Sequence, residues 1–492
     1  MFARLKKTKS ISSLIHDSHN SEHTFNKTLT SRNLIALGIG AIIGTGIFVL
    51  LGKVAAENAG PAVILSILIS GVGCVFAGLC YAEFASMIPV AGSAYTYAYA
   101  TIGEFMAWIL GWNLILEYLF ASSTVAVGWS KYVTSFLSDF GINFPHSFCN
   151  APIDTGVHGL YMTGSIINVP AMIAVGFITI LLIIGIKESV KFNNVIVLIK
   201  ISALLLFIGV GLFFINPANW HPFIPTNTGD FTNFGITGLL TGAGIIFFAY
   251  IGFDAVSTAA QESKNPQRDM PIGILGSLIV CTVLYVVVAA VLTGMVNYKE
   301  FYHDPAPLAS AIDKVSASVH SPWYFHILKF FIKIGAIAGM SSVMLVMLMA
   351  QSRIFYSMSV DGLIPPSFSK VHHKFKTPHI STIISGIGAV VIAGLLPIGI
   401  LGELVSIGTL MAFSIVCISI IILRKTNPTD KRPFRTPWVP VVPILGALIC
   451  LIQMAFLPVD TWIRLIVWIV IGVIIYFTYG LKHSKINNPE KV

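Results

Sequence analysis

The chain has 492 residues, of which 55% are hydrophobic and only 10% charged, and its formal net charge is +9. This composition excludes an ordinary soluble globular protein and predicts an integral membrane protein with many spans, whose first partner is the lipid bilayer. The basic residues collect in the connections between apolar runs, as the positive-inside rule describes. The positive charge therefore does not indicate a nucleic-acid partner.

The two ends of the chain are polar. Residues 1–32 contain Arg4, Lys6 and Lys7. This polar segment is longer than the short basic start of a signal peptide. We predict that 1–32 and 482–492 are cytoplasmic tails. The six cysteines show no spacing typical of a disulfide framework or a metal site. Neither a metal nor another cofactor is predicted. The expected coupling ion is a proton.

Apolar windows of about 20 residues predict an all-α fold with twelve transmembrane helices. Their ranges are 33–51, 61–87, 104–130, 168–186, 195–215, 236–258, 271–296, 331–357, 379–397, 402–423, 439–457 and 461–481. An even number of spans puts both termini on one side. The connections on that side hold most of the loop arginines and lysines, among them Arg353, Arg424 and Arg432. We therefore predict a multi-pass protein of the cell membrane with both termini in the cytoplasm.

The first predicted span contains the run Gly38-Ile-Gly-Ala-Ile-Ile-Gly44-Thr-Gly46-Ile-Phe48. Lipid supplies no hydrogen-bond partners, so a spanning helix is interrupted only where protein or water lines the break. Gly44 and Gly46 allow the backbone to unwind and to approach a ligand closely. A broken span of this kind is typical of a transporter binding site. The alternative is a helix-packing face, since Gly40 and Gly44 also fit a Gly-x-x-x-Gly pattern.

A second interruption follows in the sixth span, at Gly242-Ala-Gly244-Ile-Ile-Phe-Phe-Ala-Tyr-Ile-Gly252-Phe-Asp254. It separates spans one to five from spans six to ten. Because each block has an odd number of spans, the second block crosses the membrane in the opposite orientation to the first. Two broken spans at matching positions predict an inverted-repeat transporter core over 33–423, with repeats 33–215 and 236–423. The helices in 439–481 are then an addition to this core.

Several motifs resemble the amino acid–polyamine–organocation permeases. They are Ile43-Gly-Thr-Gly-Ile-Phe48, Pro89-Val-Ala-Gly-Ser-Ala-Tyr95-Thr-Tyr97, Phe248-Ala-Tyr-Ile-Gly-Phe-Asp254 and Glu262-Ser-Lys-Asn-Pro-Gln-Arg-Asp-Met-Pro-Ile-Gly-Ile274. Within that superfamily the chain is most similar to the cationic amino acid transporter branch and its bacterial relatives. The resemblance implies a five-plus-five inverted-repeat fold, with helices one and six unwound around a central amino acid site and two additional helices.

An α-amino acid presents a carboxylate and an ammonium group, and each needs partners. Backbone N–H groups of Ile43, Gly44, Thr45 and Gly46 are predicted to bind the carboxylate. The resemblance assigns the ammonium group to carbonyl oxygens of the second break, at Phe248, Ala249 and Ile251. It also suggests that Met340, beside Gly339, shapes the side-chain pocket, where a flexible thioether suits a small or aliphatic substrate.

Two charged residues within spans are candidates for coupling. Lys200, in the fifth span, matches a position where some proton-coupled relatives carry a lysine in place of a bound cation, and a carbonyl of the first break such as that of Gly44 is its expected partner. The alternative is a lysine that snorkels to the inner interface. Glu117, in the third span, either relays protons or is a protonated glutamate that only packs helices. For Asp254 we expect a structural role.

We therefore expect a secondary transporter that couples uptake of neutral L-amino acids to protons by alternating access. No acidic residue is placed to bind a cationic side chain, although a cationic amino acid or polyamine exchanger remains the alternative. A non-transporting amino acid sensor is the alternative from another class. Both predicted tails are short and hold no signalling domain, which argues against it. An enzyme is not expected, because the chain has no His-Glu-x-x-His or Gly-x-Ser-x-Gly motif.

Overall fold

The computed structural model of the chain describes residues 5–14, 29–90, 92–156, 159–185, 189–302, 304–318, 323–373, 375 and 377–488. Parts of both predicted tails, 1–4, 15–28 and 489–492, lie outside these ranges. The described tail segments 5–14 and 484–488 lie together at one end of the bundle, where Lys7 Nζ donates to the carbonyl oxygen of Ile486 at 3.1 Å.

The first predicted span is interrupted where its glycines indicate. Helix α3 (Ser31–Ile42) ends at Ile43, which has an extended backbone. The helix resumes as a π-helical turn, η1 (Gly46–Leu50), and continues through α4 (Leu51–Val54), η2 (Ala55–Ala59) and η3 (Gly60–Ala62). Apolar side chains and a Thr30 N-cap explain the helix, and the glycines explain the break.

Long helices form the rest of the first half of the chain. They are α5 (Val63–Met87), the short α6 (Ser93–Thr101), α7 (Glu104–Ile115) with the π-helical turn η4 (Leu116–Phe120) and α8 (Ala121–Ser138), α9 (Val169–Ile184) and α10 (Ser189–Gly211). Between α8 and α9 lies an antiparallel hairpin of strands β1 (Ile153–Gly156) and β2 (Gly159–Met162). This hairpin is a departure from the all-α prediction, although it does not touch the predicted spans.

The second half begins with the second broken helix. It consists of α11 (Gly235–Ile246), the 3-10 turn η8 (Phe247–Tyr250) and α12 (Ala255–Thr258). The helices that follow are α13 (Pro266–Met295), α14 (Pro307–Ser318), α15 (Trp323–Val360), α16 (His379–Leu395), α17 (Ile398–Thr426), α18 (Val441–Ala455), α19 (Val459–Ile475), η12 (Tyr476–Gly480) and α20 (Leu481–His483). The short helices α6 and α14 were not predicted, because neither is long or apolar enough to read as a span.

Within the described part of the chain, eight helices are long and apolar enough to cross a membrane by length and composition. Four other apolar helices are shorter: Ser31–Ile42, Val169–Ile184, His379–Leu395 and Val441–Ala455. Together these helices occupy all twelve predicted ranges. The prediction of a multi-pass helical membrane protein is confirmed.

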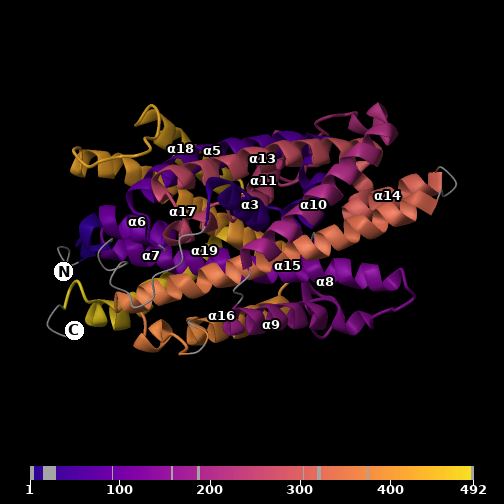
Figure 1. Ribbon diagram of the computed structural model, residues 1–492. Coiled ribbons are helices and arrows are strands. Elements are labelled where there is room, and N and C mark those ends of the chain that lie inside the picture. Colours follow the sequence, from indigo (N-terminus) through magenta and orange to yellow (C-terminus); the bar gives the residue numbers. More distant parts are fainter. Residues whose placement is uncertain are drawn as a thin grey trace.

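Helix α3 lies inside the bundle, packed against α10, α13 and α15 (Figure 1). Helices α9 and α16 lie side by side at the edge of the bundle in the same view. Because α3 and the α11–α12 region are both surrounded by other helices, the two breaks are kept away from lipid. This is the condition under which a spanning helix can be interrupted.

Candidate functional site

The two breaks are in direct contact. A Cβ atom added to Gly46 would lie 2.4 Å from the Ala249 Cα, so no larger residue fits at this crossing. Gly252 has a φ of +116° and lies against the backbone of Ala41, where an added Cβ would be 2.9 Å from the carbonyl oxygen. The glycines therefore serve two needs, an unusual backbone angle in the second break and close approach in both.

A tyrosine that the sequence analysis missed joins the breaks. The hydroxyl of Tyr285, on α13, is 3.0 Å from the carbonyl oxygen of Ile42 and 2.9 Å from that of Ala249. It is fully buried. Its position in the middle of a mainly apolar span could have indicated this role, since a buried hydroxyl group needs a hydrogen-bond partner inside the protein.

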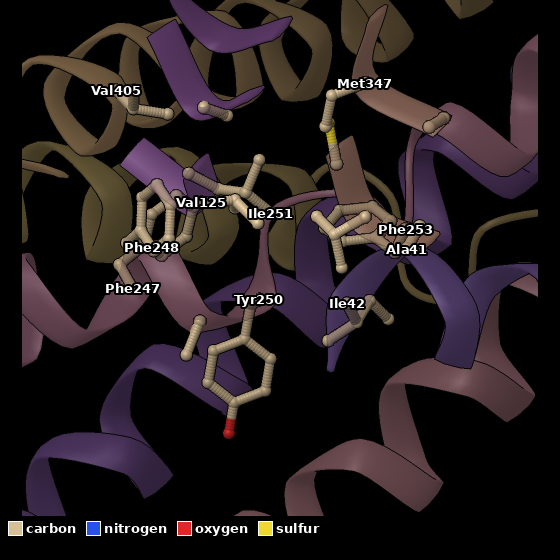
Figure 2. Close-up of a cluster of buried hydrophobic side chains, with 14 of the residues drawn as sticks. Ala41, Ile42, Val125, Phe247, Phe248, Tyr250, Ile251, Phe253, Met347 and Val405 are labelled. Atoms are coloured by element: carbon tan, nitrogen blue, oxygen red, sulfur yellow. The ribbon is translucent and has the colours of Figure 1, made fainter. Parts of the chain in front are cut away.

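A small cavity lies between the breaks. It is lined by the main chain and side chains of Ala41, Ile42, Gly44, Thr45, Gly46, Ala121, Val125, Phe248, Ile251, Val343 and Met347. Figure 2 shows Phe248 beside Val125, and Met347 pointing toward the second break. The free volume is about 10 Å³, which is room for roughly one water molecule. An amino acid needs more space, so binding requires the breaks to separate.

Most residues predicted to bind the amino acid lie at this cavity. Gly44, Thr45 and Gly46 line it from the first break, and Phe248 and Ile251 from the second. Gly44 and Thr45 precede the resumed helix and Gly46 is its first residue, and the first N–H groups of a helix have no acceptor within it. The carbonyl oxygens of Ile43 and Ala249 already accept hydrogen bonds, from Lys200 and Tyr285. These assignments of substrate contacts stay predictions.

Lys200 points into the protein. Its Nζ donates to the carbonyl oxygens of Gly40 at 2.7 Å and Ile43 at 2.9 Å, and its side chain is fully buried. The expected contact with the first break exists, but through these two carbonyls and not through Gly44. Helix α3 ends here, and its last carbonyls have no partner within the helix, so the ammonium group supplies one. A lysine held in this way does not snorkel to the interface.

Ser342 adds a second polar contact to the same place. Its hydroxyl, on α15, is 2.9 Å from Asn193 Oδ1 and 3.4 Å from the carbonyl oxygen of Gly40. Three helices, α3, α10 and α15, therefore meet around Lys200. Movement of any one of them changes the hydrogen bonds of the ammonium group.

A carboxyl pair lies at the second break. The hydroxyl of Tyr118 donates to Asp254 Oδ2, and the carboxyl group of Glu117 lies against Asp254 and Thr409. Both Glu117 and Asp254 are fully buried. Among the described residues, neither oxygen of Glu117 has a hydrogen-bond donor in good geometry. Glu117 and Tyr118 belong to the π-helical turn η4, and such turns are frequent at functional sites.

The two residues predicted to form the side-chain pocket lie on α15, outside the lining of the cavity, and their role stays a prediction. Gly339 packs against Lys200, where an added Cβ would lie 3.1 Å from the lysine Cδ. Met340 is buried but does not line the cavity. Val343 and Met347, one and two helical turns further on, line it instead. The small residues Gly335 and Gly339 of this helix make room for α10 and Lys200.

Comparisons with known proteins match this arrangement over nearly the whole chain. A family model described as "Amino acid permease" matches residues 29–476. The chain is 46% identical over 461 residues to a methylthioribose transporter of Bacillus subtilis (strain 168), covering 94% of this chain and 95% of that protein. It is also 46% identical over 479 residues to the branched-chain amino acid permease BcaP of the same organism, covering 97% and 98%.

A more distant relative belongs to the branch that the motifs indicated. The chain is 36% identical over 425 residues to cationic amino acid transporter 4, vacuolar, of Arabidopsis thaliana, covering 86% of this chain and 68% of that protein.

Proposed function

The chain belongs to the amino acid permease family, and we propose that it takes up neutral L-amino acids together with protons across the cell membrane. As an amino acid permease it is a membrane transporter and not an enzyme. Its twelve predicted spans are best explained as a five-plus-five inverted repeat followed by two helices, with both termini in the cytoplasm. The broken helices α3–η1 and α11–α12 stand first in the two repeats, which supports this arrangement.

The observation that carries the proposal is the ammonium group of Lys200 on the carbonyls of Gly40 and Ile43. In its charged form the lysine makes two charge-assisted hydrogen bonds that hold α10 against the first break. Loss of the proton leaves a neutral amine, which binds carbonyls more weakly. A proton can therefore lock and release this contact, with no need for a metal cation.

The cavity supports a neutral, apolar substrate side chain. Of the side chains that line it, only Thr45 is polar, and none is acidic. A lysine, arginine or polyamine substrate would leave its cationic end without a partner there. Methylthioribose, which the name of one relative specifies, carries ribose hydroxyls that would likewise find few partners. The branched-chain substrates in the name of the other relative fit these walls.

The test is uptake into proteoliposomes that hold the full-length protein. With an imposed inward proton gradient and no sodium, labelled leucine, isoleucine or valine should accumulate. Unlabelled arginine, putrescine and methylthioribose should compete poorly. Strict dependence on sodium, or accumulation of methylthioribose in place of amino acids, would overturn the proposal. Counterflow without a gradient separates a transporter from a sensor, because a sensor exchanges nothing.

The variant Lys200→Arg addresses the proton itself. Arginine stays charged at any accessible pH, so it can keep a contact with the carbonyls but cannot release it by losing a proton. We expect this variant to lose proton-driven accumulation. Lys299→Arg is the matched control, since Lys299 is exposed and lies far from the breaks. Accumulation by Lys200→Arg at the wild-type level would contradict the proton switch.

A further inference from the structure

A crevice of about 650 Å³ lies away from the substrate site, between the start of α13 and the connection from α17 to α18. Asn265, Gln267 and Arg268 form its polar end. The other walls are apolar and consist of Pro271, Ile272, Leu275 and Gly276 on α13 and Pro433 and Phe434 on the connection. The proposed transport cycle does not use this space.

The wall made by the connection is firmly held. Glu83, at the end of α5, is fully buried and accepts hydrogen bonds from Arg424 Nη2 at 2.8 Å and from the backbone N–H of Thr436 at 2.7 Å. The backbone N–H of Phe434 also donates to Ser86 Oγ at 3.3 Å. These contacts fix Phe434 opposite α13, so the crevice is a built part of the fold.

The polar end of the crevice carries positive charge without a partner. Arg268 is exposed and forms no ion pair or side-chain hydrogen bond within the described ranges. The nearest acid in sequence, Asp269, accepts the backbone N–H of Asn265 at 3.3 Å. An anionic group placed beside Arg268 would therefore gain a charge-assisted hydrogen bond.

The apolar walls continue along the lipid-facing side of α13. Ile272 is 40% exposed, Ile279 57% and Val283 59%, and these positions share one face of the helix. The polar end lies on the side of the bundle where the N-terminal tail enters, because Leu29 pairs with Ser263 just before α13. Trp438, on the connection, is 81% exposed, as expected of an aromatic residue at the membrane interface.

We propose that the crevice binds one anionic phospholipid of the leaflet on the tail side. Its phosphate lies beside Arg268, and an acyl chain follows Ile272 and the exposed face of α13. A free anion would use only the polar end, and a zwitterionic lipid such as phosphatidylcholine would bring a quaternary ammonium group beside the cation of Arg268. Gly276, at the floor of the crevice, contacts Ile35 of α3, so the bound lipid supports the half-helix that leads to the first break.

The experiment is native mass spectrometry of the full-length protein in detergent, with phosphatidylglycerol or phosphatidylcholine of identical acyl chains. The wild type should retain one phosphatidylglycerol at least about tenfold more strongly than phosphatidylcholine, because the choline ammonium group offsets the attraction of the phosphate to Arg268. Equal retention of the two lipids would overturn the proposal.

Two variants separate the headgroup from the acyl chain. Arg268→Gln removes the charge, and Ile272→Trp fills the apolar wall from an exposed position without disturbing the core. Each should lower phosphatidylglycerol retention about tenfold. Lys482→Gln, at an exposed site on α20, should not change it. Unchanged retention in Arg268→Gln would overturn the proposal.

A further experiment with inorganic phosphate separates a lipid site from a site for free anions. The midpoint temperature of thermal unfolding of the wild type should rise when phosphatidylglycerol is added. The same concentration of phosphate should leave it unchanged. Stabilisation by phosphate that Ile272→Trp leaves intact would identify a plain anion site and overturn the lipid assignment. Since all readouts are of binding, they stay informative whatever substrate the permease carries.

Discussion

The two breaks expose opposite ends of helices. A basic side chain lies at the first break and an acidic side chain at the second. At the first break α3 ends, and its carbonyl oxygens at Gly40 and Ile43 accept from the cation of Lys200. At the second break α12 begins, and the acid Asp254 stands at its N-cap position beside the first N–H groups. Cations suit the carbonyl end of a helix and anions the amide end. The first break is therefore stabilised by the cation that its helix end favours, whereas Asp254 makes no capping hydrogen bond and accepts from Tyr118 instead.

The two charges differ in where they are attached. Asp254 belongs to the second break and moves with it, and the hydroxyl of Tyr118 holds it from η4. Lys200 belongs to a different helix, α10, and touches the first break only through its ammonium group. A contact between two helices can open when one of them moves or when the amine loses its proton. If uptake is coupled to protons as we propose, we expect the contact of Lys200 with the first break to switch during transport and the contacts of Asp254 to persist.

The largest effect is expected from the glycines at the crossing of the breaks. Gly46→Val should abolish substrate binding, because the obstacle is the backbone of Ala249 and cannot move aside. At Gly44 the obstacle is a side chain, Val343 Cγ2 at 2.9 Å. Gly44→Ala should therefore bind weakly and recover when Val343→Ala is added. Thermal-shift titration with leucine in detergent measures both.

Gly209→Ala is the control for these variants, since an added Cβ on Gly209 meets nothing within 4 Å. Its binding should equal that of the wild type. Size-exclusion profiles establish that each variant is folded before binding is compared. Normal binding by Gly46→Val would show that the substrate does not enter between the breaks.

A second experiment sets the two charges against each other. Lys200→Ala removes two charge-assisted hydrogen bonds, each worth about 1.5–3 kcal/mol, and should abolish accumulation under a proton gradient. Asp254→Asn keeps an acceptor for Tyr118 and should slow uptake while accumulation persists. Proteoliposome uptake measures rate and final level separately. The reverse result, with accumulation lost only in Asp254→Asn, would move the switch to the second break.

Much of this arrangement could be predicted from the sequence. The two glycine-rich interruptions located both breaks, since glycine permits the close approach of the two backbones and, at Gly252, a positive φ. A lysine in an apolar run indicated the contact with the first break, because burying that charge needs a partner. Residues of this kind are informative because their physical cost in lipid is high.

The residues that sequence patterns could not place are ordinary for a membrane helix. Tyr285 looked like any aromatic side chain, and its two acceptors lie in segments distant in sequence. Met340 and Met347 both suit a pocket, and only packing shows that Gly339 and its neighbours are used to accommodate Lys200. The carbonyls chosen by Lys200 depend on where α3 ends, which sequence patterns fix only to within a turn.

A third, smaller effect concerns the link between the breaks. Tyr285→Phe leaves the carbonyls of Ile42 and Ala249 without this donor, at a cost of about 1–3 kcal/mol. Uptake should fall several-fold, because the breaks lose the hydrogen bonds that draw them together again after they separate for binding. Tyr250→Phe is the matched control, because its hydroxyl bonds to Ile67 on α5 and not to a break. Equal effects of the two variants would mean that Tyr285 contributes only stability.

The smallest effect is a change of specificity without loss of transport. Met347 lines the cavity from the side facing both breaks, whereas Met340 lies two turns away and does not line it. Met347→Ala removes volume from the cavity wall, so larger side chains such as phenylalanine should compete better for leucine uptake. Met340→Ala should leave the competition panel unchanged although it empties a similar volume. A panel altered by Met340→Ala alone would restore the pocket that the sequence predicted, and would mean that α15 slides along its axis when the breaks separate around the substrate.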